Sequence, residues 1–226
     1  MSLTRQHLES GYIRRIFAGR PNGPRCLTDE EHRASIGALL ADHCPESDIW
    51  VFGYGSLVWN PLFHFAERRI ATLHGFHRRF CLWSLTGRGT PENPGLVLGL
   101  DRGGRCTGVL YRIPRKAAAE ELFLLWRREM VVGSYAPRWV SVRDRHGRDI
   151  RALAFIVRRD HPNYAGKLPA ERVAATMSTA CGAIGPCADY LAKTVEGLAE
   201  HGIRDAHLTD LHGRVFGTRG PRTDPA

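Results

Sequence analysis

The sequence lacks any apolar run near the roughly 20 residues that a membrane-spanning helix requires. Residues 1–15 also lack the apolar segment of a secretory signal, because Arg5, Glu9, Arg14 and Arg15 interrupt them. We therefore expect a soluble, cytoplasmic protein that has no membrane partner.

No two cysteines form a C-x-x-C pair, and the six cysteines stand at wide, irregular spacings. A chain of 226 residues can bury a core large enough to fold without disulfides. We expect reduced and mostly buried thiols. The cysteines are Cys26, Cys44, Cys81, Cys106, Cys181 and Cys187.

Two common catalytic motifs are also missing. The 11 histidines, His74-x-x-His77 included, form no H-E-x-x-H or comparable ligand frame, so a metal-dependent hydrolase is disfavoured and neither a metal nor another cofactor is expected. A serine-nucleophile elbow around Ser56 would need glycine at positions 54 and 58, where Tyr54 and Val58 stand.

Positive charge is in excess, with 32 Lys and Arg against 23 Asp and Glu and a formal net charge of +9. Such a balance favours anionic partners such as nucleic acid, a membrane surface or a small acid. No single helix presents a basic face interleaved with aromatic residues, as nucleic-acid readers do. A solvated basic surface is the simpler interpretation, and no nucleic-acid partner is expected. A basic nucleic-acid or anionic-surface binding module stays as an alternative.

The first part of the chain, residues 1–47, has the pattern of a helical extension. Thr28-x-x-Glu31 is a capping box, and it predicts a helix that runs to about His43 before Pro45. From residue 49 the pattern changes, because Ile49-Trp50-Val51-Phe52 is an apolar run typical of a strand buried on both faces.

Strands dominate the middle of the chain and helices its end. A helix is predicted over residues 115–130, and residues 170–215 have a largely helical pattern. Turn signals separate further predicted strands at residues 76–85, 96–100, 106–113, 139–143 and 150–157.

This order fits one α+β domain with a mixed sheet that can close into a small barrel. We divide the chain into an N-terminal helical extension packed on the main domain, residues 1–47, the main domain, residues 48–216, and a tail, residues 217–226. The tail is rich in Gly, Pro and charge, and is expected to be disordered. The sequence gives no expectation for the oligomeric state.

A loop with two glycines, Gly53-Tyr54-Gly55-Ser56-Leu57, follows the first predicted strand. Glycines on both sides of a tyrosine allow backbone angles closed to other residues, so consecutive N–H groups can face one concavity. Such amides suit the carboxylate of an amino acid, and Ser56 can add a hydroxyl donor. An ordinary turn between strands is the simpler alternative.

One carboxylate stands on an apolar helix face. Leu122, Leu125, Trp126 and Glu129 recur at i, i+3, i+4 and i+7, and Glu129 lies in the last turn, where the helix dipole disfavours an anion by roughly 0.3 to 1 kcal/mol. Partial burial would raise the pKa of Glu129 further, which suits a general acid and base near neutral pH. Alternatively, Glu129 reaches solvent or pairs with Arg128.

Several separated motifs together resemble the ChaC family. They are Val51-Phe52-Gly53-Tyr54-Gly55-Ser56-Leu57-Val58-Trp59-Asn60-Pro61, then Arg88-Gly89-Thr90 and Pro94-Gly95, then Trp126-Arg127-Arg128-Glu129-Met130 before Gly133-Ser134-Tyr135, then Asp160-His161-Pro162-Asn163-Tyr164, and Asp189-Tyr190-Leu191. The likeness covers roughly residues 5–212 and looks closest to the bacterial branch. Residues 181–187 depart from the family's polar glycine turn. Members of this family are glutathione-specific γ-glutamylcyclotransferases.

The resemblance implies a γ-glutamylcyclotransferase-like fold, which is a small mixed β-barrel with flanking α-helices. It implies an enzyme that converts glutathione to 5-oxoproline and L-cysteinylglycine without a cofactor, with Glu129 as the proton-transfer residue. Other γ-glutamyl amino acids or amines are alternative substrates. The implied substrate-binding residues are Val51, Phe52, Gly53, Tyr54, Gly55, Ser56, Leu57, Arg88, Tyr135 and Tyr164.

Overall fold

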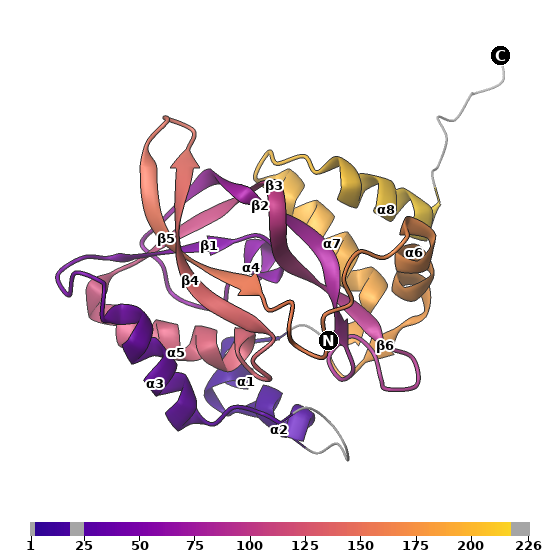
Figure 1. The fold of residues 1–226 in the computed structure, drawn as a ribbon, viewed down its shortest axis with the longest axis horizontal. Coiled ribbons are helices and arrows are strands. Elements are labelled where there is room, and N and C mark those ends of the chain that lie inside the picture. Colours follow the sequence, from indigo (N-terminus) through magenta and orange to yellow (C-terminus); the bar gives the residue numbers. More distant parts are fainter. Residues whose placement is uncertain (1–2, 19–24, 218–226) are drawn as a thin grey trace.

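A closed five-stranded barrel forms the centre of the computed structural model, which describes residues 3–18 and 25–217 (Figure 1). The strand order is β1-β3-β2-β4-β5, and a parallel contact between β1 and β5 closes the circle. All other neighbours in this order are antiparallel, so the predicted small mixed barrel is confirmed. The strands are β1 (Ile49–Gly53), β2 (Glu67–Ser84), β3 (Gly95–Ile113), β4 (Tyr135–Asp144) and β5 (Asp149–Val157).

The longest strands, β2 and β3, extend beyond their predicted bounds. They pair antiparallel from Glu67 opposite Arg112 to Ser84 opposite Gly95, with register shifts on the way. The sequence prediction began the first of them only at residue 76 and broke the second at residues 101–105. Residues 67–75 mix charged side chains with the buried Ala71 and Leu73, so no clear strand pattern is visible there. Residues 102–105 are exposed, and their Arg102-Gly103-Gly104 run was interpreted as a turn.

Helix α5 (Ala118–Glu129) follows a short 3₁₀ turn, η1 (Arg115–Ala117), and confirms the helix predicted over residues 115–130. Its apolar face is fully buried against the barrel through Leu122, Leu125 and Trp126. The Trp126 ring lies edge-on to Phe155 of β5, with centroids 5.2 Å apart. This packing fixes the C-terminal turn of α5, and Glu129 with it, against the barrel wall.

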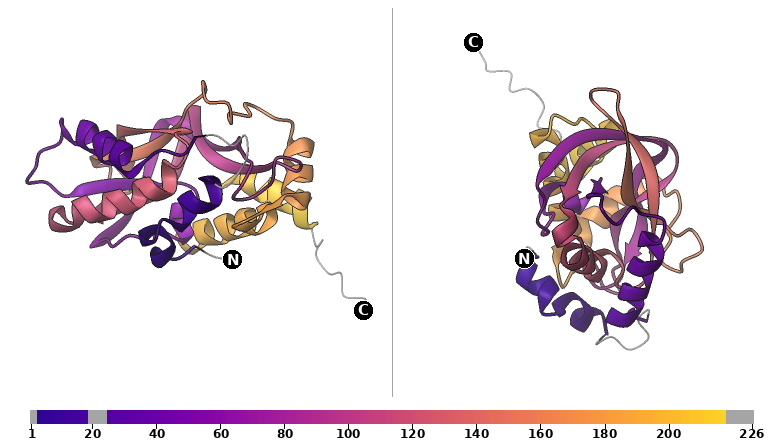
Figure 2. Two further views of the ribbon diagram at one scale, coloured as in Figure 1. Left: turned by 90° about the horizontal axis from the view of Figure 1, so that it is seen from below. Right: turned by 90° about the vertical axis from the view of Figure 1, so that its left-hand side faces the viewer.

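In the described residues before the barrel, 3–18 and 25–48, the helices are α1 (Arg5–Glu9), α2 (Tyr12–Ala18) and α3 (Asp29–Leu40). The predicted capping box at Thr28 and Glu31 is present, and α3 ends at Leu40 rather than near His43. Figure 2 shows these helices gathered beside α5 on one side of the barrel. The boundary at residues 47 and 48 stays a prediction.

The part predicted to be largely helical, residues 170–215, contains α6 (Ala170–Thr179), α7 (Cys187–Glu200) and α8 (Ala206–Phe216). A small hairpin of β6 (Cys181–Gly182) and β7 (Gly185–Pro186) joins α6 to α7. Short helix α4 (Ser56–Trp59) packs on α7, where a Cβ on Gly197 would lie 2.7 Å from the Trp59 Cβ. Beyond residue 217 the predicted tail lies outside the described residues.

Two features bear on the expectations for membranes and thiols. Within residues 3–18 and 25–217, no helix is both long and apolar enough to span a membrane. All six cysteines are free thiols. Only Cys81, Cys106 and Cys187 are buried, so the expectation of mostly buried thiols holds for half of them.

Candidate active site

Glu129 ends α5 with a largely buried side chain, which is 14% exposed. Its Oε1 atom lies 3.1 Å from Nε of Arg128, an ion pair whose geometry leaves this buried oxygen without a hydrogen-bond donor. Burial raises the pKa of Glu129 above that of an ordinary carboxyl, and the Arg128 charge offsets part of the rise. The expected direction of the shift is therefore present, together with the pairing to Arg128.

Arg128 is the positive charge next to Glu129, and its side chain is only 5% exposed. Its Nη1 donates to the carbonyl oxygens of Asn60 and Pro61, just after α4. Burial lowers the pKa of Arg128 and the Glu129 charge opposes this, but a guanidinium stays protonated. Arg128 thus connects the end of α5 to the segment that follows the glycine loop.

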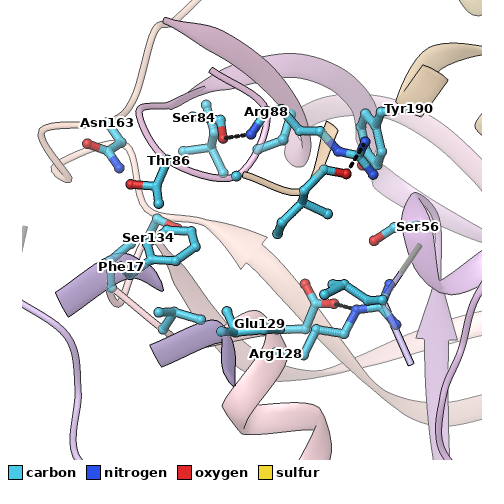
Figure 3. A pocket seen from close by; sticks show the side chains of 18 of the residues that line it. Phe17, Ser56, Ser84, Thr86, Arg88, Arg128, Glu129, Ser134, Asn163 and Tyr190 are labelled. Atoms are coloured by element: carbon cyan, nitrogen blue, oxygen red, sulfur yellow. Dashed lines mark hydrogen bonds and ion pairs between the residues drawn. The ribbon is translucent and has the colours of Figure 1, made fainter. Parts of the chain in front are cut away.

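A cavity of about 170 Å³ opens beside Glu129 (Figure 3). A second, inner pocket of about 20 Å³ shares Ser56, Glu129, Tyr135 and Tyr190 with it. Glu129 therefore stands where the two spaces meet. The inner pocket is lined by Tyr54, Gly55, Ser56, Leu57, Leu98, Glu129, Tyr135, Phe155 and Tyr190.

The glycine loop reaches the inner pocket, but for a different reason than the sequence suggested. Neither Gly53 nor Gly55 has a positive φ, and Gly55 has φ −128° and ψ −125°. What Gly55 supplies is space, because a Cβ there would lie 3.1 Å from Oη of Tyr190. The N–H groups of Ser56 and Leu57 belong to the first turn of α4, where no intrahelical acceptor exists.

Three tyrosines surround the inner pocket. Tyr54 donates its hydroxyl to the Phe155 carbonyl oxygen at 2.9 Å, and Tyr135 donates to the Leu98 carbonyl oxygen at 2.7 Å. Burial raises the pKa of Tyr54 and of Tyr135 well above the usual value. Burial and the Glu129 charge raise the pKa of Tyr190 to about 12. All three are therefore neutral near pH 7, and two have their hydroxyl protons engaged.

Arg88 brings a second positive charge to the cavity and is 8% exposed. Its Nη1 donates to the carbonyl oxygens of Ile184 and Pro186, and its guanidinium lies 5.4 Å from the centroid of the Tyr190 ring. Burial lowers the pKa of Arg88. Within residues 3–18 and 25–217 Arg88 forms no ion pair with a carboxylate, so its charge is available to an anionic ligand.

Four of the expected substrate-binding residues do not reach these cavities. Val51 and Phe52 are fully buried in the barrel wall, and Gly53 ends the same strand against Tyr111. Tyr164 donates to Oδ2 of Asp101 at 2.9 Å, outside the cavity lining. Their positions support a structural role, because Val51, Phe52 and Gly53 pack in the barrel wall and Tyr164 hydrogen-bonds the buried carboxylate of Asp101.

Several lining residues were not expected from the sequence. Tyr190 was quoted within a family motif but given no role, because only the packing of α7 brings it beside Glu129. Ser134 and Asn163 stand in quoted motifs in the same way. Leu3, Ile13 and Phe17 carried no functional signal at all. Further polar lining residues without an expected binding role are Asn60, Ser84, Thr86 and Arg128.

Comparison with known proteins identifies relatives for this arrangement. A family model described as "ChaC-like protein" matches residues 49–217. The chain is 43% identical over 182 residues to the glutathione-specific gamma-glutamylcyclotransferase of Escherichia coli K12, covering 80% of this chain and 79% of that protein. It is 32% identical over 169 residues to human glutathione-specific gamma-glutamylcyclotransferase 1, covering 72% and 76%.

A solved structure agrees with these relatives. The crystal structure of a γ-glutamyl cyclotransferase specific to glutathione from yeast superposes with a TM-score of 0.70 at 28% identity, covering 75% of this chain and 96% of that one. The family match runs from the first barrel strand to the end of α8, and so contains both Glu129 and the glycine loop. By sequence and by fold, the chain belongs to the ChaC family.

Proposed function

We propose that this chain is a glutathione-specific γ-glutamylcyclotransferase, which releases 5-oxoproline and L-cysteinylglycine. The relatives that carry this name support the activity. The observation that carries the proposal is the position of Glu129, a buried carboxylate between an inner pocket and a larger cavity. Such a layout suits a substrate whose γ-glutamyl head stays enclosed while the cysteinylglycine part leaves as a product.

The γ-glutamyl head is assigned to the inner pocket together with the part of the larger cavity that adjoins it, because the inner pocket alone has room for little more than one water molecule. Its α-carboxylate meets the free amides of Ser56 and Leu57 and the Ser56 hydroxyl, since charge-assisted bonds from several donors hold a carboxylate firmly. The charges of Arg88 and Arg128 add positive potential at this end. The α-ammonium then faces Glu129, the only carboxylate among the described residues that line the inner pocket.

Enforced proximity supplies much of the rate in this scheme. The α-amine and the γ-carbonyl belong to one molecule, and holding them together makes a five-membered lactam. Oriented intramolecular attack reaches effective molarities on the order of 10⁵ to 10⁸ M. The enclosing side chains of Tyr54, Leu98 and Phe155 favour the folded substrate because an extended one would not fit the inner pocket.

Glu129 moves the proton. The ionised carboxylate takes a proton from the α-ammonium, and the free amine attacks the γ-carbon to give a tetrahedral intermediate. As the bond from the γ-carbon to the cysteinyl nitrogen breaks, Glu129 returns the proton to that nitrogen. No water molecule is consumed. The attacking nitrogen loses a second proton to solvent when the lactam forms, and the released cysteinylglycine amine takes up one proton from solvent to become ammonium, so the net proton count is unchanged.

Release assays on two substrates test the proposal. We expect 5-oxoproline and cysteinylglycine in equal amounts from glutathione, no effect of EDTA, and slow or no 5-oxoproline release from γ-glutamyl-alanine. Equal turnover of both substrates would instead indicate a broad γ-glutamylcyclotransferase. Absence of turnover together with salt-sensitive retention on DNA would favour the basic binding module.

The pH dependence should reveal the influence of Arg128 on Glu129. Because protonated Glu129 cannot accept a proton, kcat/KM falls as pH decreases through the raised pKa of this carboxyl. Removing the neighbouring charge raises that pKa further. The acidic limb of kcat/KM should therefore move to higher pH in Arg128→Gln. The other ionisable groups that face Glu129 are Tyr54, Tyr135 and Tyr190, and all three stay neutral.

Arg138→Gln is the control for this profile, because it also removes one positive charge. Arg138 is exposed on β4 and lines neither cavity. Its acidic limb should coincide with that of the wild type. An acidic limb in Arg128→Gln that also coincides with the wild type would contradict the proposed coupling of Arg128 to Glu129.

We also propose a cytoplasmic location. The support is the set of six free thiols, which persist in a reducing compartment where glutathione is abundant as the thiol.

A further inference from the structure

The N-terminal helices contribute a wall to the cavity beside Glu129. Leu3, together with Ile13 and Phe17 of α2, lines the cavity of about 170 Å³. These residues precede the 49–217 segment that matches the family, so the family pattern assigns them no role. The cavity of this chain is therefore completed by a segment outside the family match.

Polar contacts attach α1 firmly to the helix that carries Glu129. Arg5 pairs with Glu121, whose side chain is 2% exposed, at 2.6 Å and with Glu120 at 2.8 Å. Arg127 of α5 donates to the Glu9 carbonyl oxygen at 2.7 Å. A buried charge pair of this kind fixes geometry, because breaking it leaves an uncompensated charge.

Further contacts bring the segment to the cavity itself. Asn60 donates its amide to the Leu3 carbonyl oxygen at 3.1 Å, while its own carbonyl oxygen accepts from Arg128. Ile13 is 4% exposed and packs in one apolar cluster with Val131. The wall is thus linked to the same Arg128 that faces Glu129.

The lining of the cavity offers both apolar and polar groups. The N-terminal residues, together with Val131 and Val132, supply apolar surface, and Ser84, Thr86 and Asn163 supply polar groups. In Figure 3 Ser56 and Tyr190 lie toward one end of the cavity, and Phe17 and Ser134 lie toward the other. A dipeptide extending away from Glu129 can direct its peptide groups to the polar groups and its side chain to the N-terminal apolar surface.

We infer that Leu3, Ile13 and Phe17 form the subsite for the side chain of the residue that follows the γ-glutamyl group, and limit it to the size of a cysteinyl thiol. This inference rests on the proposed function. A thiol behaves as a small apolar group and suits an apolar wall. Alkylation of the sulfur adds volume that a closely fitting apolar wall cannot accommodate, so the subsite would select the unmodified thiol.

Competition between glutathione and S-propylglutathione tests the subsite. An apolar pocket discriminates by roughly 10- to 200-fold for each methylene that it cannot accommodate. Phe17→Ala should raise the ratio of kcat/KM for S-propylglutathione over glutathione at least tenfold. Phe17→Leu, which keeps an apolar and less disruptive side chain, should raise it by a smaller factor in the same direction.

Phe216→Ala is the matched control, because Phe216 is 50% exposed on α8 and lines neither cavity. Its substrate ratio should equal that of the wild type. If both Phe17 variants turn over glutathione and keep the wild-type ratio of kcat/KM for S-propylglutathione over glutathione, the subsite assignment is wrong and the proposed function stands. If the wild type itself releases no 5-oxoproline from glutathione, the proposed function fails and the subsite assignment with it.

Discussion

Replacing Glu129 by glutamine should abolish nearly all release of 5-oxoproline from glutathione while the chain still folds. Glutamine keeps the shape of the side chain but cannot accept the ammonium proton or return one to the leaving nitrogen. Proton transfer by a positioned group typically contributes about 10² to 10⁴-fold to the rate. We expect a loss of that size in kcat, measured by 5-oxoproline release at saturating glutathione.

Glu196→Gln is the control for this substitution. Glu196 is exposed on α7 and lines neither cavity. Its activity should stay close to that of the wild type. If Glu129→Gln keeps more than about a tenth of wild-type activity, the loss is smaller than that expected for any general acid and base. That result would rule out this role for Glu129.

The same substitution should not lower stability at neutral pH. The folded-state pKa of Glu129 is raised by burial, so the unfolded chain releases this proton at a lower pH than the folded one. Above the unfolded-state pKa of about 4.3, ionisation therefore favours unfolding. Glutamine avoids that cost. The thermal midpoint of Glu129→Gln should equal or exceed the wild-type midpoint at pH 7. Any advantage should shrink as the pH falls from the raised folded-state pKa of Glu129 to its unfolded-state pKa.

Gly55→Ala should reduce kcat/KM for glutathione by about 100-fold or more, because small displacements of a substrate from its reactive geometry have effects of this size. The added Cβ would lie 3.1 Å from Oη of Tyr190 and 3.5 Å from Cδ1 of Leu98. It would narrow the inner pocket at the end of the site where we place the γ-glutamyl head. Steady-state kinetics with glutathione measure the effect.

Gly37→Ala is the control for the added methyl group. A Cβ on Gly37, in α3, would meet nothing within 4 Å. That variant should keep wild-type kcat/KM and gain slightly in stability, as alanine favours a helix over glycine. If Gly55→Ala folds and turns over glutathione like the wild type, the γ-glutamyl head does not occupy the inner pocket.

Much of the fold follows from local sequence signals. The capping box at Thr28 and Glu31, the apolar strand from residue 49 and the helix ending at Glu129 were all predictable, because each depends on contacts within a few residues. The full length of β2 was not predictable. Its first half pairs with the distant end of β3, and tertiary pairing there overrides the polar, turn-like sequence.

A site residue was predictable only where its type is unusual for the local sequence pattern. Glu129 is a carboxylate on an apolar helix face, and Gly55 is a glycine directly after a buried strand. Tyr190 and Phe17 gave no such signal, because an aromatic residue on a helix is typical of ordinary core packing. They reach the cavity through the docking of α7 and α2, which no local pattern encodes.

A crystal structure of Glu129→Gln with glutathione tests the central claim most directly. We predict the γ-glutamyl head in the inner pocket, with its α-carboxylate on the amides of Ser56 and Leu57. Its α-nitrogen should lie about 3 to 3.5 Å from both the γ-carbon and the residue 129 side chain. A head group bound outside the inner pocket, with its amine turned away from position 129, would contradict the account.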